Sequence, residues 1–342
     1  MATLAITRDT IAVHLEQQHL ELIGIDADDG DGRRRINVPL RDIERVVVSG
    51  CPSISLQAMH ALMRNGIPVS FISSHHRWLG ALTTDNLANA KRRIAQYKAS
   101  ENEDFRLVVA SELVHCKIRN CRRVLQRLAG ARKESDTLEQ TEATRSLAEL
   151  AHRVSRIPES MESLRGYEGM AAAVYFSRLK GFFPENLPFE GRSKHPPLNA
   201  ANAIMSWTYA IVTGEIVTAI KTHGLDPYLG FLHDISYNQP SLACDLIEPL
   251  RAPLCDMLVM HLLNHRILRP EHFESHGCDD GVYLNANGKR AFFPAYEAAM
   301  EREFSRPHED GHDTFRKVID EQVLAIIGVL EGNSRYEFFA MP

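Results

Sequence analysis

The chain has 342 residues, of which 44% are hydrophobic and 24% charged, and its formal net charge is −5. These proportions are ordinary for a globular protein with a sizeable core, and the length favours two domains. They exclude a generally basic nucleic-acid-binding protein, so any surface that binds nucleic acid must be local.

Six cysteines are scattered along the chain, and no two of them form a C-x-x-C pair. In a long chain this pattern predicts reduced thiols. The first residues lack the basic start and continuous apolar core of an export signal. No apolar run is expected to reach the length that spans a membrane. We therefore expect a cytoplasmic protein that makes no membrane contact.

The first 86 residues predict a small β-rich N-terminal domain. Six segments rich in β-branched residues favour strands: TLAITR, IAVHLEQQHLELIGI, RRINVPL, IERVVVSG, IPVSFIS and RWLGALT. A short helix is expected at 53–66, capped by Ser53 or Ser55 and ended by Asn65 and Gly66. The DADDGDG stretch at 26–32 lacks the closing glutamate of a calcium loop and predicts a solvated hairpin turn.

From about Leu87 the hydrophobic period becomes helical and remains so. Helices are expected within 86–129 and at 144–157, 159–183, 201–224, 283–304 and 314–332. Residues 131–144 and 184–199 are expected to be connections. The predicted class is therefore α+β multidomain, with a β-rich domain at 1–86 and a larger all-α domain at 87–342.

The segment GFLHDISYNQPSLACDLIEPLR, residues 230–251, places acids among apolar residues. Buried carboxylates are costly unless they are paired or bind a metal. Ser241 is a plausible N-cap, which puts Asp245 and Glu248 on one face of the following helix. Pro249 and Pro253 each remove a backbone donor and predict a kink. The acids that need an explanation are Asp234, Asp245, Glu248 and, just beyond, Asp256.

A second acid lies in LRGYEGMAAAVYF, where Glu168 shares a helical face with small and apolar residues. Together with His233 and Glu248, and with Asp245 nearby, it makes an oxygen-rich set with one imidazole. Such a set suits Mg²⁺ or Mn²⁺, whereas zinc more often takes additional His or Cys ligands. The alternative is that each acid is separately solvated or salt-bridged.

A local excess of positive charge lies between Lys91 and Lys133. Twelve Lys or Arg residues stand against four acids there, an excess of eight. This predicts a surface for a phosphate backbone, although a solvated helix face balanced by acids elsewhere would give the same count. The candidate DNA-binding residues are Lys91, Arg92, Arg93, Arg122, Arg123 and Arg127.

Other motifs are weaker. His233-Asp234 is the dipeptide of a metal-dependent phosphohydrolase class, which needs more histidines on neighbouring helices. The sequence contains no P-loop, dinucleotide fingerprint or nucleophile elbow.

Four segments together resemble one family. They are VVVSG followed by ISLQAMHALMRNGIPVSFIS, then LRGYEGMAAAVYF, PPLNAANAIMSWTYAI and LDPYLGFLHDISYNQPSLACDLIEPLR. Over nearly the whole chain the pattern is similar to the CRISPR-associated integrase family, the metal-dependent DNA endonuclease subunit of spacer acquisition.

The resemblance implies an N-terminal β-domain that joins a homodimer and a helical catalytic domain. It also implies a small second CRISPR-associated acquisition subunit that bridges two dimers. Carried over, the Mg²⁺ or Mn²⁺ ligands are Glu168, His233 and Glu248. Asp245 falls on another acidic position of the family pattern, as a supporting residue or an alternate ligand.

The implied reaction is transesterification on double-stranded DNA. The 3′-hydroxyl of a captured fragment attacks a phosphate at a repeat end of the CRISPR array, and with water as nucleophile the site would be a nuclease. Two alternatives stay open, a nucleotide phosphohydrolase acting through His233-Asp234 and a non-catalytic DNA-binding scaffold.

Overall fold

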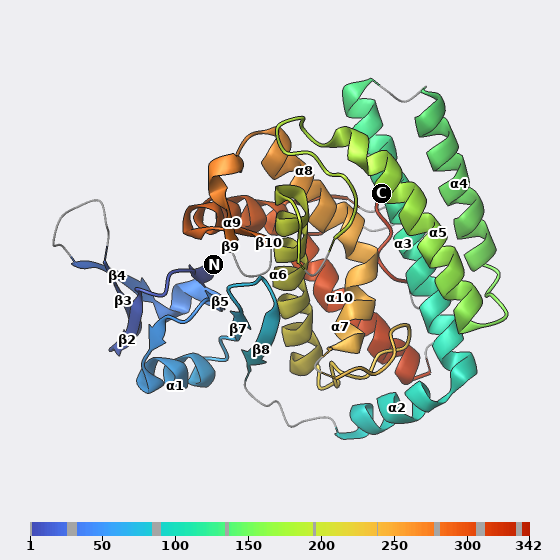
Figure 1. Cartoon of the computed structure of the whole chain (residues 1–342). Coiled ribbons are helices and arrows are strands. Elements are labelled where there is room, and N and C mark those ends of the chain that lie inside the picture. Colours follow the sequence, from blue (N-terminus) through green and yellow to red (C-terminus); the bar gives the residue numbers. More distant parts are fainter. Residues whose placement is uncertain are drawn as a thin grey trace.

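The computed structural model describes residues 2–25, 33–83, 90–133, 137–193, 196–237, 239–276, 281–305, 312–332 and 337–342 (Figure 1). The predicted turn at 26–32 lies outside the described residues, and so does the predicted domain boundary between residues 86 and 87. That boundary stays a prediction.

Two four-stranded sheets form the N-terminal region, as the strand-rich sequence predicted. In the first, the strand order is β1 (Ala2–Ile6), β5 (Ile43–Ser49), β7 (Val69–Ile72) and β8 (Trp78–Leu82). The first three are parallel and β8 is antiparallel to β7. In the second, the order is β4 (Arg33–Pro39), β3 (His19–Ile25), β2 (Ala12–Glu16) and β6 (Ser53–Ile54). A 3₁₀ turn, Leu40–Asp42, precedes β5.

One helix, α1 (Leu56–Arg64), belongs to this region. Its cap is Ser55, whose hydroxyl accepts from the Ala58 amide, and the chain leaves it through Gly66 at φ +66°. Glycine tolerates that left-handed conformation without strain. Buried Ile, Val and Leu side chains of the strands and of α1 form a core of their own here.

The rest of the chain is helical, with long helices packed side by side (Figure 1). The helices are α2 (Ala90–Glu101), α3 (Glu103–Arg132), α4 (Leu138–Val154), α5 (Met161–Leu179), α6 (Ala200–Thr222), α7 (Ser241–Leu250), α8 (Met257–Asn264), α9 (Ala286–Glu301) and α10 (Phe315–Leu330). A π-helical segment, Arg251–Asp256, joins α7 to α8, and 3₁₀ turns occupy Lys180–Phe182 and Pro270–His272.

Some details differ from the sequence prediction. The region expected to be all-α also carries an antiparallel hairpin of β9 (Phe273–His276) and β10 (Gly281–Leu284). In addition, α4 begins at Leu138, inside the segment expected to be a connection, because Thr137 caps it. A side-chain cap at this position outweighs the polar composition of the first turn.

Helix α6 packs between the first sheet and the helices α7, α8 and α10. By length and hydropathy, 1.4 over an 18-residue window, it could cross a membrane, so the expectation that no run is long enough was wrong. However, 78% of that window is buried inside the protein, as in the core helix of a globular fold.

The first sheet packs closely against α6. A Cβ at Gly214 would lie 3.2 Å from Trp78 and 3.3 Å from Ser70, so the glycine permits the close approach. Beside it, Glu215 pairs with Arg45 of β5 and accepts a hydrogen bond from Tyr296. The sheet and the helices therefore form one continuous structure.

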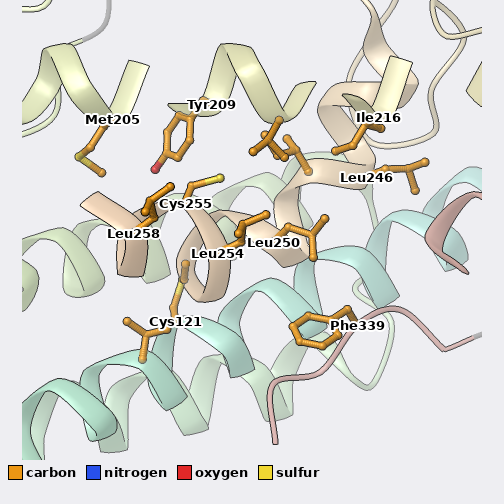
Figure 2. Close-up of a cluster of buried hydrophobic side chains, with 14 of the residues drawn as sticks. Cys121, Met205, Tyr209, Ile216, Leu246, Leu250, Leu254, Cys255, Leu258 and Phe339 are labelled. Carbon is orange, nitrogen blue, oxygen red and sulfur yellow. The ribbon is translucent and has the colours of Figure 1, made fainter. Parts of the chain in front are cut away.

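A dense apolar layer supports α7 and the π-helical segment (Figure 2). Leu246, Leu250, Leu254 and Leu258 lie between α6 on one side and α3 on the other, and all four are nearly inaccessible to solvent. This layer fixes the backbone from which the acidic residues project.

The cysteines in the described part of the chain are free, as predicted, and Cys278 lies outside that part.

Candidate metal centre

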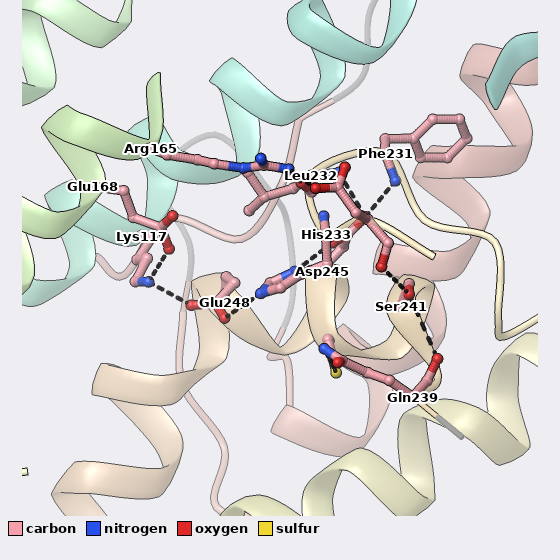
Figure 3. Close-up of polar contacts among 12 residues, drawn as sticks. Lys117, Arg165, Glu168, Phe231, Leu232, His233, Gln239, Ser241, Asp245 and Glu248 are labelled. Atoms are coloured by element: carbon pink, nitrogen blue, oxygen red, sulfur yellow. Dashed lines mark hydrogen bonds and ion pairs between the residues drawn. The ribbon is translucent and has the colours of Figure 1, made fainter. Parts of the chain in front are cut away.

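Asp245 on α7 organises the loop that carries His233 (Figure 3). Its buried carboxylate accepts the backbone amides of Phe231, Leu232 and His233 at 2.6, 3.0 and 2.9 Å. Gly230 makes this wrapping possible, because a Cβ there would lie 2.6 Å from Asp245 Oδ2. With both oxygens engaged, Asp245 acts as the anchor of the loop.

The imidazole of His233 is oriented by the same carboxylate. Its Nδ1 lies 2.7 Å from Asp245 Oδ1, and because an ionised carboxylate only accepts, Nδ1 carries the proton and donates. Burial alone would lower the pKa of His233, but the hydrogen bond and charge of Asp245 raise it. Nε2 is left facing Glu248, whose Oε1 is 3.9 Å away.

Glu248 projects from α7 just before the helix changes its hydrogen-bond pattern. Pro253 has no amide proton, so the Pro249 carbonyl loses its usual helical donor. Asn120 of α3 supplies one instead, at 2.7 Å. The predicted kink is thus a π-helical segment, and a buried asparagine satisfies its freed carbonyl.

Lys117 of α3 stands between the two glutamates (Figure 3). Its ammonium lies 2.5 Å from Glu168 Oε1 and 2.7 Å from Glu248 Oε2. Glu248 Oε2 is buried, and its contact with the ammonium is an ion pair without regular hydrogen-bond geometry. Arg251 holds the other oxygen of Glu248 at 3.0 Å.

These pairs set the ionisation of the pocket. Burial would lower the pKa of Lys117, yet the charges of Glu248 and Glu168 hold it above its ordinary value. Burial would likewise raise the pKa of Glu248, but Arg251 and Lys117 bring it down to about 2. Both groups are therefore charged at neutral pH.

Glu168, His233 and Glu248 line one pocket of about 290 Å³. They come from α5, from the loop before α7 and from α7 itself, so the fold brings together the three residues that the sequence analysis singled out. Two carboxylates and a free imidazole nitrogen are donors that suit Mg²⁺ or Mn²⁺. Within the described residues, however, no three His, Cys, Asp or Glu side chains already converge as a metal cage, since Lys117 separates the glutamates.

The other two acids of the segment have different surroundings. Asp234 is 63% exposed at its side chain and pairs with Arg106 and Arg165 at 3.1 and 2.6 Å. Asp256 is buried and accepts from Tyr175 and Tyr209, at 2.8 and 2.6 Å. Burial raises the pKa of Asp256 to about 6, although both tyrosines counteract this.

The predicted DNA-binding residues point in several directions. Lys91 and Arg122 are exposed, whereas Arg92 donates to the His223 carbonyl. Arg123 and Arg127 both donate to the Pro342 carbonyl at 2.9 Å while remaining largely exposed. Arg93 is half-buried, and its buried Nε has no hydrogen-bond partner among the described residues.

Sequence reasoning missed the role of Lys117 by counting it with the basic run. One signal was present, because Val114 and Cys121 place Lys117 on the buried face of its helix.

The predicted N-cap of α7 was one residue late. The helix begins at Ser241 itself, after Pro240, and the Ser241 hydroxyl donates to the Asp234 carbonyl at 3.0 Å.

Comparison with known proteins gives a consistent answer. The family model described as CRISPR associated protein Cas1 matches residues 4–298. A CRISPR-associated endonuclease Cas1 of Thermodesulfovibrio yellowstonii is 31% identical over 325 residues, which cover 94% of this chain and 98% of the relative. One from Thermus thermophilus is also 31% identical, over 89% of this chain and 87% of the relative.

Solved structures share the fold. A CAS1 protein from Thermotoga maritima superposes with a TM-score of 0.77 at 21% identity, covering 99% of this chain and all of the other. A casposase bound to integration product gives 0.86 at 20% identity, covering 100% and 94%. With a family model matched over most of its length and an endonuclease relative above 30% identity that it spans almost completely, the chain belongs to the Cas1 family of CRISPR-associated endonucleases.

Proposed function

We propose that this protein joins the 3′-hydroxyl ends of captured DNA fragments to the repeat ends of a CRISPR array by metal-dependent transesterification. The names of its relatives support an endonuclease, and the casposase neighbour is described as bound to integration product. The observation that carries the proposal is the meeting of Glu168, His233 and Glu248 on one pocket, from three separate segments.

In this proposal Glu168, Glu248 and Nε2 of His233 hold one Mg²⁺ or Mn²⁺. When bound, such an ion polarises the scissile phosphate and stabilises charge on the attacking and leaving oxygens. Asp245 keeps the imidazole oriented with its proton on Nδ1, which leaves Nε2 available. Arg251 and Arg192 line the same pocket and supply positive charge for phosphate oxygens.

The proposed partners are double-stranded DNA, a second copy of this chain and a small acquisition subunit. One structure with the same fold, at a TM-score of 0.81 and 22% identity, is described as a Cas6-RT-Cas1–Cas2 complex. The chain covers 36% of that longer neighbour. We propose dimerisation through the N-terminal sheets, which are too small to bury all their faces alone.

The scaffold alternative has one observation in its favour, since Lys117 already pairs with both glutamates as a purely structural salt bridge would. The phosphohydrolase alternative has less support, because Asp234 is bound by two arginines away from Glu248. Metal-dependent joining of DNA strands separates the proposal from both alternatives, because neither a non-catalytic scaffold nor a nucleotide phosphohydrolase would join DNA.

A strand-transfer assay with a pre-cut DNA fragment and a repeat-containing target tests the proposal. Glu168→Gln and His233→Ala should each lower joining by about 10³-fold or more, by analogy with the loss of groups that stabilise transition-state charge. DNA affinity, measured in parallel, should change little because the basic surface is intact. Joining at the wild-type rate by either variant, or in excess chelator, would rule out the proposed mechanism.

A further inference from the structure

Lys117 occupies the space that an ion shared by Glu168 and Glu248 would need. Its single ammonium contacts one oxygen of each carboxylate, at 2.5 and 2.7 Å. The two glutamates project from different helices, α5 and α7, and the lysine comes from a third, α3. A cation bracketed by carboxylates from separate elements is also the arrangement that a divalent ion takes in proteins.

The setting explains why this space contains a positive charge. The side chains of Lys117, Glu168 and Glu248 are 18%, 20% and 2% exposed. Two carboxylates facing each other with so little water would repel, and one would have to take up a proton. A cation between them removes that cost.

The Lys117 side chain also has space to move away from the two carboxylates. Its four-carbon stem rotates freely, unlike the planar guanidinium of arginine, and the pocket of about 290 Å³ opens beside it. The ammonium can therefore swing away from both carboxylates without any movement of α3.

We propose that Lys117 is an exchangeable cation, which holds Glu168 and Glu248 together until a divalent ion arrives and leaves both carboxylates when that ion binds. This inference rests on the proposed metal site. Metal binding is then an exchange of one cation for another, so the lysine lowers the apparent affinity for the metal while it preserves the site.

The test is a titration of the full-length protein with Mn²⁺ alone, following free Mn²⁺ by electron paramagnetic resonance. Lys117→Met should bind Mn²⁺ about tenfold more tightly than wild type, as expected when a competing state populated at about 90% is removed. Arg165→Met is the matched control, because Arg165 lines the same pocket but bonds Asp234 instead of either glutamate. Its affinity should stay within about threefold of wild type.

Thermal unfolding gives a second readout. Without metal, Lys117→Met should melt at a lower temperature than wild type, and saturating Mn²⁺ should raise its melting temperature by more than it raises that of wild type. A Lys117→Met protein that is unfolded without metal and folds on addition of Mn²⁺ supports the same conclusion. Exposed Lys98→Met, on α2, controls for loss of a lysine.

The outcomes separate this inference from the proposed function. If wild type binds Mn²⁺ and Lys117→Met binds it no more tightly than Arg165→Met, the proposed exchange of Lys117 is wrong, whereas the proposed metal site is supported. If wild type, Lys117→Met and Glu168→Gln all fail to bind Mn²⁺ at millimolar concentration, both the proposed metal site and the proposed exchange are wrong.

Discussion

At the scale of single residues, two acids three positions apart have opposite tasks. Asp245 turns back to the loop and accepts three backbone amides and the imidazole, whereas Glu248 faces the pocket with Lys117 and Arg251. The sequence predicted that both lie on one helical face, because helix geometry fixes that spacing. It could not assign the tasks, since a rotation of about 60° between the two side chains decides which partner each one meets.

Asp256 gives the clearest pH dependence. Its pKa is about 6 in the folded chain against an ordinary 3.8, because burial disfavours the charge. Between these values the folded state binds a proton that the unfolded state lacks, so this group favours folding more as the pH falls. Relative to Asp256→Asn, the free energy of unfolding of wild type should increase by about 2 kcal/mol as the pH is lowered from 7 to 4.5.

Urea denaturation of both proteins at the two pH values measures this difference. A stability gap that does not change with pH would show that Asp256 is already ionised without penalty in the folded protein.

At the scale of elements, the break after α7 depends on one asparagine of α3. Asn120 is 1% exposed, donates to the carbonyls of Pro249 and Phe339, and accepts the amide of Met341. It therefore joins the end of α7 to the last described residues. Pattern alone predicted a kink from the two prolines, but not the distant donor that satisfies it, because hydrogen bonds between elements leave no period in a sequence.

Asn120→Ala should lower the free energy of unfolding by about 3 kcal/mol, since it leaves buried backbone groups without partners. Ser111→Ala is the matched control on the same helix, because the buried Ser111 hydroxyl has no hydrogen-bond partner among the described residues. The control should be within about 1 kcal/mol of wild type. Equal losses in both variants, measured by urea denaturation, would contradict the proposed role of Asn120.

At the scale of the whole molecule, the sequence predicted the strand-rich region followed by a larger helical one, and the structure confirms it. The change of hydrophobic period marked that division clearly. The basic run was less informative, because a count of charges along the sequence does not show in which direction each side chain points. Lys117 lies in the pocket and Arg106 bonds the loop, while Arg123 and Arg127 reach the Pro342 carbonyl.

The DNA surface therefore needs its own test. Changing Arg122, Arg123 and Arg127 together to Ala should weaken DNA binding and reduce the slope of log affinity against log salt by about 3, because each phosphate that an arginine no longer neutralises removes about one unit. The control changes three exposed arginines of α4 and its C-terminal end, Arg145, Arg153 and Arg156. If the slope falls only in the control, the DNA surface lies on the α4 side.

The central claim is that Glu168, His233 and Glu248 meet on one divalent ion. Anomalous diffraction from crystals of the wild-type protein grown with Mn²⁺ tests it most directly. We expect one strong peak in the pocket, about 2.2 Å from a carboxylate oxygen of each glutamate and from Nε2 of His233. A pocket without a peak, in which Lys117 still contacts both glutamates at saturating Mn²⁺, would contradict the claim.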